Sequence, residues 1–199
     1  MVSRHRDRRI ARDLVIGAIT AVVSQGGMVR EARAESVPFE LQADLMKKVV
    51  RFERGFVARC GPEVDLLLVM RDGDTRSERA AAQLAPALRA LGAIAGKPVV
   101  LAVLRYSTAA ALKDAVVRGR VDLIYLTPGL EPDVSAIAAT LEGVPVITVA
   151  GDGGEVDHGA VLGFELVSAR PRISINLGQA RKQGLDFNSD LFRLARVVR

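Results

Sequence analysis

The sequence contains no tryptophan, a single cysteine and few aromatic residues, which make up 4% of its 199 residues. Surfaces that stack sugars or bases use exposed rings, so such a site is disfavoured. The lone Cys60 excludes an intramolecular disulfide framework and a cysteine-based metal site. Cys60 lies in a turn before a predicted strand, where we expect a small, half-buried residue; an intermolecular disulfide is left open.

Catalytic patterns are also missing. The chain has two histidines, and His5 lies in a segment that we expect to be removed, so a Ser-His-Asp triad would depend on His158. No serine lies in a G-x-S-x-G turn, and no glycine-rich phosphate loop is present. The sequence therefore predicts no catalytic residues, no cofactor and no bound metal ion.

Positive charge is concentrated at the N-terminus. The formal net charge is +5, but residues 1–34 hold seven arginines against three acidic residues, and the remainder has 21 basic and 20 acidic residues. The rest of the chain thus lacks a field of one sign that would attract a phosphate backbone, and we expect no nucleic-acid partner.

The first 34 residues have the organisation of a signal peptide. A basic stretch at residues 4–12 precedes the apolar run 14–23, and Ala32-Arg33-Ala34 fits a signal peptidase site. We predict cleavage after Ala34, export to the periplasm and a single domain over residues 35–199. An uncleaved amphipathic or anchoring helix is the alternative. No other run is long enough to cross a bilayer.

The central part of the chain alternates strand-like and helix-like segments. We predict helices at 36–54, 77–91, 109–117 and 133–141, and strands at 64–70, 99–104, 121–126 and 144–150. This order is typical of an α/β fold, a three-layer α/β/α arrangement with a mainly parallel sheet. Pro86 is expected to shorten or kink the second helix. Thr108 is expected to cap the third helix and Gly119 to end it.

The last 40 residues form a different pattern. Residues 160–168 and 170–175 are too close for a crossover, which predicts an antiparallel hairpin followed by two C-terminal helices. Asn176 is expected to cap the first of these helices and Gly184 to end it. Asn188 or Ser189 would cap the second, whose predicted apolar face comprises Leu191, Leu194, Ala195 and Val198.

The carboxyl ends of parallel strands are the usual place for a ligand. Here they carry the loops 71–76, 106–108, 127–131 and 151–159. Candidate ligand-loop residues are Thr127, Gly129, Asp152 and His158. Glu155 and Asp157 complete an acidic cluster, but its spacing does not match a calcium-binding loop, and a solvated turn explains it better.

The C-terminal residues carry a resemblance. The segments Gly163-Phe164-Glu165, Arg172-Ile173-Ser174-Ile175-Asn176 and Gly184-Leu185, with Ala180, Ser189, Leu191, Leu194 and Ala195, resemble the closing signature of the YfiR-like family. The resemblance implies an exported, periplasmic α/β domain that is not an enzyme. Its best-known relatives bind and repress a membrane-bound diguanylate cyclase, and related domains accompany sensor histidine kinases. Redox-regulated members carry paired cysteines, which this chain lacks.

We therefore predict a periplasmic signalling regulator that binds a membrane-bound signalling protein through an exposed apolar patch or its first helix. It would touch the membrane only through that partner, and homodimerisation is left open. The motif residues are expected to serve the fold first, because caps and left-handed glycines explain them. The alternative is a periplasmic small-ligand protein that uses the loops 127–131 and 151–159.

Overall fold

The computed structural model describes residues 36–198, which belong to one compact unit. The predicted signal peptide, 1–34, lies outside the described residues. Within residues 36–198, every helix is too short or too polar to span a bilayer.

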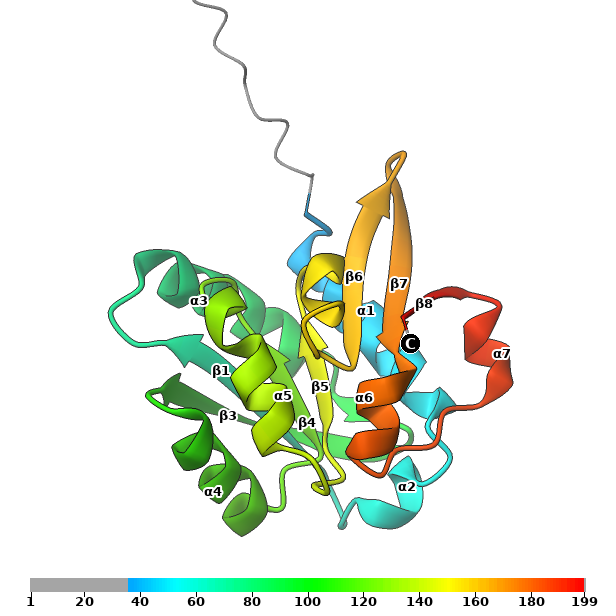
Figure 1. The fold of residues 1–199 in the computed structure, drawn as a ribbon, viewed down its shortest axis with the longest axis horizontal. Coiled ribbons are helices and arrows are strands. Elements are labelled where there is room, and N and C mark those ends of the chain that lie inside the picture. Colours follow the sequence, from blue (N-terminus) through cyan, green and yellow to red (C-terminus); the bar gives the residue numbers. More distant parts are fainter. Residues whose placement is uncertain (1–35, 199) are drawn as a thin grey trace, which may run out of the picture. The chain divides into compact units, whose positions relative to one another are not determined.

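An eight-stranded mixed sheet forms the centre of the fold (Figure 1). The strands are β1 Val64–Arg71, β2 Ala93–Ile94, β3 Lys97–Tyr106, β4 Leu123–Leu126, β5 Ile147–Ala150, β6 Leu162–Val167, β7 Arg170–Asn176 and β8 Ala195–Val198. Their order is β2-β3-β1-β4-β5-β6-β7-β8. Pairing is parallel except at the β2–β3 and β6–β7 hairpins, so the predicted mainly parallel sheet and terminal hairpin are confirmed.

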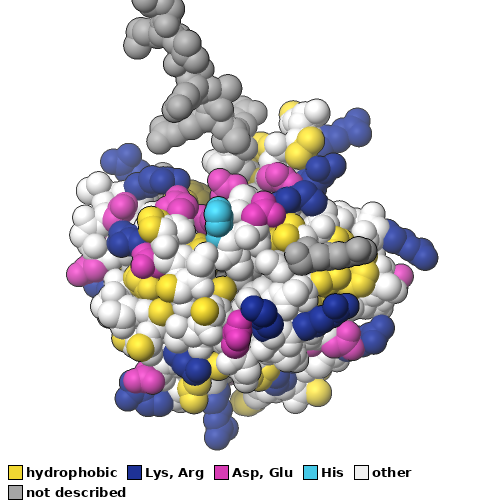
Figure 2. Space-filling model, viewed as in Figure 1, with side chains coloured by type: hydrophobic (Ala, Val, Ile, Leu, Met, Phe, Trp, Pro, Cys, Tyr) yellow, Lys and Arg dark blue, Asp and Glu magenta, His cyan; other side chains and the backbone are white. Residues whose placement is uncertain are grey.

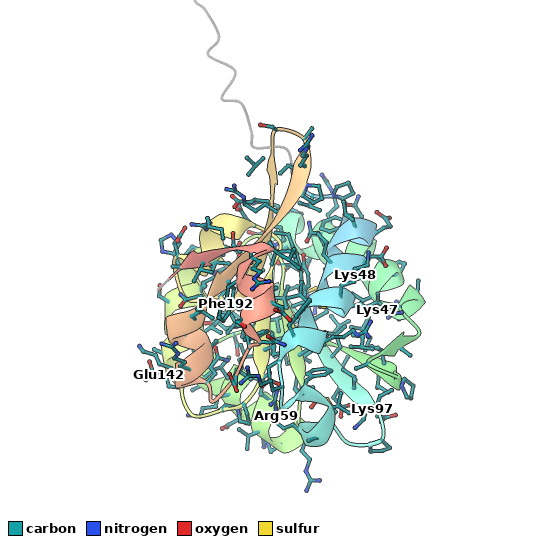
Figure 3. The ribbon with its side chains drawn as sticks, turned by 90° about the vertical axis from the view of Figure 1, so that its right-hand side faces the viewer. Lys47, Lys48, Arg59, Lys97, Glu142 and Phe192 are labelled. Carbon is teal, nitrogen blue, oxygen red and sulfur yellow. The ribbon has the colours of Figure 1, made fainter. Side chains whose placement is uncertain are left out.

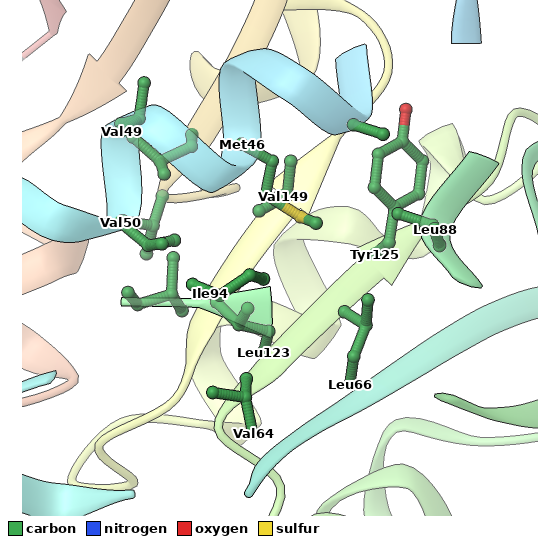
Figure 4. Close-up of a cluster of buried hydrophobic side chains, with 14 of the residues drawn as sticks. Met46, Val49, Val50, Val64, Leu66, Leu88, Ile94, Leu123, Tyr125 and Val149 are labelled. Atoms are coloured by element: carbon green, nitrogen blue, oxygen red, sulfur yellow. The ribbon is translucent and has the colours of Figure 1, made fainter. Parts of the chain in front are cut away.

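Helices cover both faces of this sheet. The helices are α1 Phe39–Val49, α2 Phe56–Arg59, α3 Thr75–Ala90, α4 Ala109–Gly119, α5 Val134–Thr140, α6 Leu177–Lys182 and α7 Ser189–Phe192, with 3-10 turns η1 Val50–Phe52, η2 Glu131–Asp133 and η3 Gly153–Val156. One core lies under α1 and α3 and includes Met46, Leu88 and Tyr125 (Figure 4). A second core lies under α4 and α5. Two cores on one sheet produce the expected three layers.

Strand β1 is buried on both faces because its alternate side chains enter the two cores. Leu66 and Leu68 belong to the first core, and Leu67 and Val69 to the second. The uninterrupted apolar run in the sequence follows from this two-sided burial.

Side-chain caps begin several helices where the sequence predicts them. The Thr108 side chain accepts from the Ala111 amide at 3.2 Å at the start of α4. Asn176 accepts from the Gln179 amide at 2.8 Å at the start of α6. Gly184 follows α6 with φ +73°, the left-handed conformation expected of a glycine after a helix.

Two predictions about helix ends differ from the structure in detail. Helix α3 continues through Pro86 to Ala90, next to the predicted end at Leu91, so the proline does not shorten it. Pro86 and Ala82 both lie on the exposed side, so water can satisfy the Ala82 carbonyl that the proline leaves without a donor. Helix α4 includes Gly119, and Arg120 instead adopts the left-handed conformation, with φ +51°.

The predicted final helix is also too long. Helix α7 ends at Phe192, and Ala195–Val198 form β8, parallel to residues 173–176 of β7. The residues predicted to form one apolar helix face therefore do not lie together: Leu191 is fully buried, while Leu194 is 61% exposed. Pairing with β7 satisfies backbone groups of a sheet edge, and this long-range gain exceeds the local preference for a helical turn.

Candidate functional site

Two of the four predicted ligand-loop residues lie at the point where the strand order reverses, between β1 and β4. Thr127 is fully buried, and its hydroxyl lies 2.6 Å from that of Ser77 and donates to the Val69 carbonyl at 3.0 Å. Gly129 donates its amide to Glu131 at 2.8 Å. An open α/β sheet binds ligands at this position, but here both residues already have partners within the chain.

Arg71 closes the same edge from the end of β1. Its Nε donates to the Gly129 carbonyl at 2.5 Å, and its guanidinium pairs with Asp133. Arg76 pairs with Glu131 at 2.9 Å. At this sheet edge, where the strand order reverses, the hydrogen-bonding groups described above thus bond to one another.

The other two ligand-loop residues, Asp152 and His158, lie on the loop after β5. Asp152 caps η3 by accepting from the Gly154 amide at 2.9 Å. The His158 side chain is exposed on the surface (Figure 2), and its carbonyl accepts from the Ser135 hydroxyl at 3.1 Å. Asp157 pairs with Arg196 at 3.2 Å. Among the described residues, no three side chains of the acidic, histidine or cysteine type converge as metal ligands.

Glu155, from the same loop, points inward and is 4% exposed. Its Oε2 has no hydrogen-bond partner in the described part of the chain. Burial, reinforced by the carboxylates of Glu131 and Asp152 and opposed by Arg76, raises the pKa of Glu155 to about 8. This carboxyl group is therefore largely protonated at neutral pH.

The family-motif residues divide between packing and the surface. Gly163 permits η3 to lie against β6, since a Cβ there would approach Val156 Cγ2 to 2.6 Å. Ala180, Leu185 and Leu191 are buried in the first core. Ala180, Leu185 and Ser189 also line a cavity of about 210 Å³ between α6 and α7, together with Phe192.

The turn after η1 is attached to the loop before α7 by a buried carboxylate. Glu53 is 4% exposed; its Oε1 accepts from the amides of Gly55 at 3.2 Å and Asp186 at 3.1 Å. Its Oε2 pairs with Arg59 at 2.9 Å. The adjacent backbone pairs Arg54 with Asp186 and Asn188 with Phe52. These contacts join the segment after α1 to the segment before α7.

A groove runs beside α1. We call it the basic groove; it has a volume of about 770 Å³ and is lined by Asp44, Lys47, Lys48, Arg51, Val57, Ala93, Ala95 and Gly96. Figure 3 shows Lys47 and Lys48 on α1, on the same side of the molecule as Lys97. A second hollow of about 480 Å³ is lined by Lys48, Arg51, Phe52 and Asn188. Lys48 and Arg51 therefore border both.

The sequence contained a signal for this groove. Asp44, Lys47, Lys48 and Arg51 have the spacing of neighbours on one helical face. The other wall comes from α2, β2 and the β2–β3 turn, and β2 was not predicted. Sequence reasoning did not select these four residues as a site, because the surface that they face forms only in the folded chain.

Cys60 is buried at 6% exposure, deeper than expected. Burial, with the Asp122 carboxylate nearby, raises the pKa of its thiol to about 12. A thiolate is the reactive form, so the structure disfavours the intermolecular disulfide that the sequence left open.

The model of a family described as YfiR/HmsC-like matches residues 63–196. This range includes β1 to β7, the first two residues of β8 and all the motif residues. No curated protein matches the sequence.

Solved structures with a similar fold include substrate-binding proteins. The ligand-free, open structure of a substrate binding protein with adhesive properties from Clostridium difficile has a TM-score of 0.55 and 14% identity, covering 82% of this chain and 60% of that one. The ABC domain in complex with L-Trp from Streptococcus pneumonia has a TM-score of 0.56 and 11% identity; the match covers 81% of this chain and 62% of that one. A conserved domain protein from Vibrio cholerae has a TM-score of 0.53 and 13% identity; the match covers 83% of this chain and 61% of that one.

The chain therefore spans about three fifths of the length of these proteins. At such identities the likeness concerns the fold alone.

Proposed function

The chain belongs to the YfiR/HmsC-like family, and on that premise we propose that it is an exported, non-enzymatic signalling regulator of the periplasm. It binds the periplasmic part of a membrane-bound protein, such as a diguanylate cyclase or a sensor kinase. The observation that carries the proposal is the family match over residues 63–196. The export signal predicted at residues 1–34 is consistent with this location.

The features of the domain favour binding over catalysis. The polar groups of Arg71, Thr127 and Gly129 at the sheet edge bond to other groups of the chain, and Glu155 carries a raised pKa with its side chain enclosed. A general base needs access to a substrate proton, which such an enclosed group lacks. A regulator needs only a surface that its partner recognises.

The test is cross-linking in cells. The full-length chain with a C-terminal tag is cross-linked in the periplasm and purified from solubilised membranes, and captured proteins are identified by mass spectrometry. We expect a membrane protein with a periplasmic region and a cyclase or kinase module. For a cyclase partner, deletion of the gene should raise cellular cyclic di-GMP. Recovery of no membrane protein above the untagged control would refute the proposal.

A periplasmic small-ligand protein is the second candidate. The fold resembles that of substrate-binding proteins, and Thr127 and Gly129 lie where such sheets bind ligands. Native mass spectrometry of the purified chain distinguishes the two. A bound small molecule that is lost on Gly129→Val, in a variant that remains folded, would favour this function over the first.

A further inference from the structure

The basic groove has an unusual balance of charge. Lys48 and Arg51 are exposed, and neither forms an ion pair or hydrogen bond with another residue of the described chain. The only acidic residue in the lining is Asp44, one turn earlier on the same helix face. By contrast, Arg71, Arg76 and several other arginines of the domain are paired with carboxylates. The groove therefore presents net positive charge.

The opposite wall has little charge. It consists of Val57, which is 51% exposed, with Ala93, Ala95 and Gly96. Ala95 and Gly96 both have positive φ, which forms the tight β2–β3 turn. These small side chains leave room for the backbone of a second chain, and an exposed valine offers apolar contact.

Both walls of the basic groove are held in place. Lys47 bridges from α1 to the carbonyl oxygen of Leu91 at 3.0 Å. The Lys97 ammonium donates to the carbonyl oxygens of Val57, Cys60 and Gly61, each at 2.8 Å. A surface held in this way loses little conformational entropy when a partner binds.

The two cations that are unpaired within the described chain lie close together. Lys48 is in the last turn of α1 and Arg51 follows three residues later in η1, a spacing that brings two side chains onto neighbouring positions of one face. Lys48 and Arg51 also continue into the second hollow beside Phe52. Two cations that border two adjoining hollows, opposite an apolar wall, are complementary to a chain that passes through both hollows and carries carboxylates beside apolar side chains.

We propose that the basic groove is the docking site for an extended acidic segment, with small apolar side chains, of the membrane partner's periplasmic part. This inference rests on the proposed function and names the surface that serves it. Lys48 and Arg51 supply charge that accelerates and orients docking, and Val57 and Ala95 contact the apolar side chains of the segment.

The first test measures peptide binding by fluorescence anisotropy with the full-length chain. The probe is a labelled peptide of alternating Glu and Val, about ten residues long. Lys48→Glu/Arg51→Glu should weaken binding on the order of ten-fold or more, since two attractions between these cations and the peptide's carboxylates become two repulsions. The control, Arg89→Glu/Arg118→Glu, makes the same charge change in the last turns of α3 and α4 and should change binding less than about two-fold.

Circular dichroism verifies that both double variants are folded. A Lys and Val peptide should not bind. No binding of the Glu and Val peptide, or equal effects of the two double variants, would overturn the proposal. Binding of phosphatidylglycerol vesicles that depends on Lys48 and Arg51, without peptide binding, would overturn it in favour of a lipid surface.

The second test uses the partner captured in cells. A photo-reactive residue at position 51 should cross-link to an acidic segment of that partner, and one at position 117, on the exposed side of α4, should not. If a membrane partner is captured but charge reversal at Lys48 and Arg51 leaves its capture unchanged, the basic groove is not the docking site, while the proposed function stands. If wild-type chain captures no partner, the proposed function fails, and the peptide test still decides the groove.

Discussion

The buried carboxyl of Glu155 should make the stability of the domain depend on pH. Its pKa is raised from 4.5 to about 8, so the folded state holds the proton more tightly than the unfolded chain does. The resulting stabilisation is therefore complete below about pH 4.5 and is lost as pH rises through about 8. Ionisation at higher pH leaves a buried charge beside the carboxylates of Glu131 and Asp152, with Arg76 as the opposing cation.

The magnitude follows from the size of the shift. A difference of about 3.5 pH units at about 1.4 kcal/mol per unit gives at most about 5 kcal/mol. Local relaxation and entry of water reduce this loss, so about 2–4 kcal/mol is expected. Glu155→Gln resembles the protonated side chain and cannot ionise. The variant should therefore lie within about 1 kcal/mol of wild type near pH 5 and exceed it by about 2–4 kcal/mol near pH 9.

Urea unfolding at several pH values measures this difference directly. The control is Glu40→Gln, which removes an exposed carboxylate from the first turn of α1 and should give no comparable gain at high pH. If Glu155→Gln and wild type lose stability in parallel between about pH 5 and 9, the reasoning from burial is refuted.

Three further predictions concern the packing of the domain. Glu53→Ala should cost about 3–5 kcal/mol of unfolding free energy, because Arg59 loses its buried partner. Glu53→Gln keeps an acceptor oxygen and should cost less, so equal urea midpoints for the two variants would contradict this prediction. Gly163→Ala should cost about 1–3 kcal/mol through steric overlap with η3, and Gly61→Ala, with open space around its Cβ, is the control. Cys60 should react with a thiol reagent only after unfolding, so rapid labelling of the native chain would show that the thiol is accessible.

Local sequence determined many of the elements. The apolar run of β1 predicts a strand buried on both faces, and the alternation of strands and helices predicts the parallel sheet. Thr108 and Asn176 begin their helices, and Gly184 ends one, because caps and left-handed turns depend on neighbouring backbone groups alone.

Other features depended on residues distant in sequence. The chain after Phe192 became β8 because β7 offered a free edge, and Arg196 then reached Ser174, Asp157 and the Gly153 carbonyl. The ligand-loop candidates follow two strands that only the folded sheet makes neighbours: Thr127 and Gly129 come after β4, and Asp152 and His158 come after β5.

The division follows from the range of the interactions. Sequence by itself determined most of the segments that are strands or helices, and how several of the helices begin. Only the tertiary structure decided the strand order, the burial of Glu155 and the wall that faces Lys48 and Arg51. These three features depend on contacts between segments far apart in the chain. Such contacts form when the whole sheet packs, and local conformational preference does not determine them.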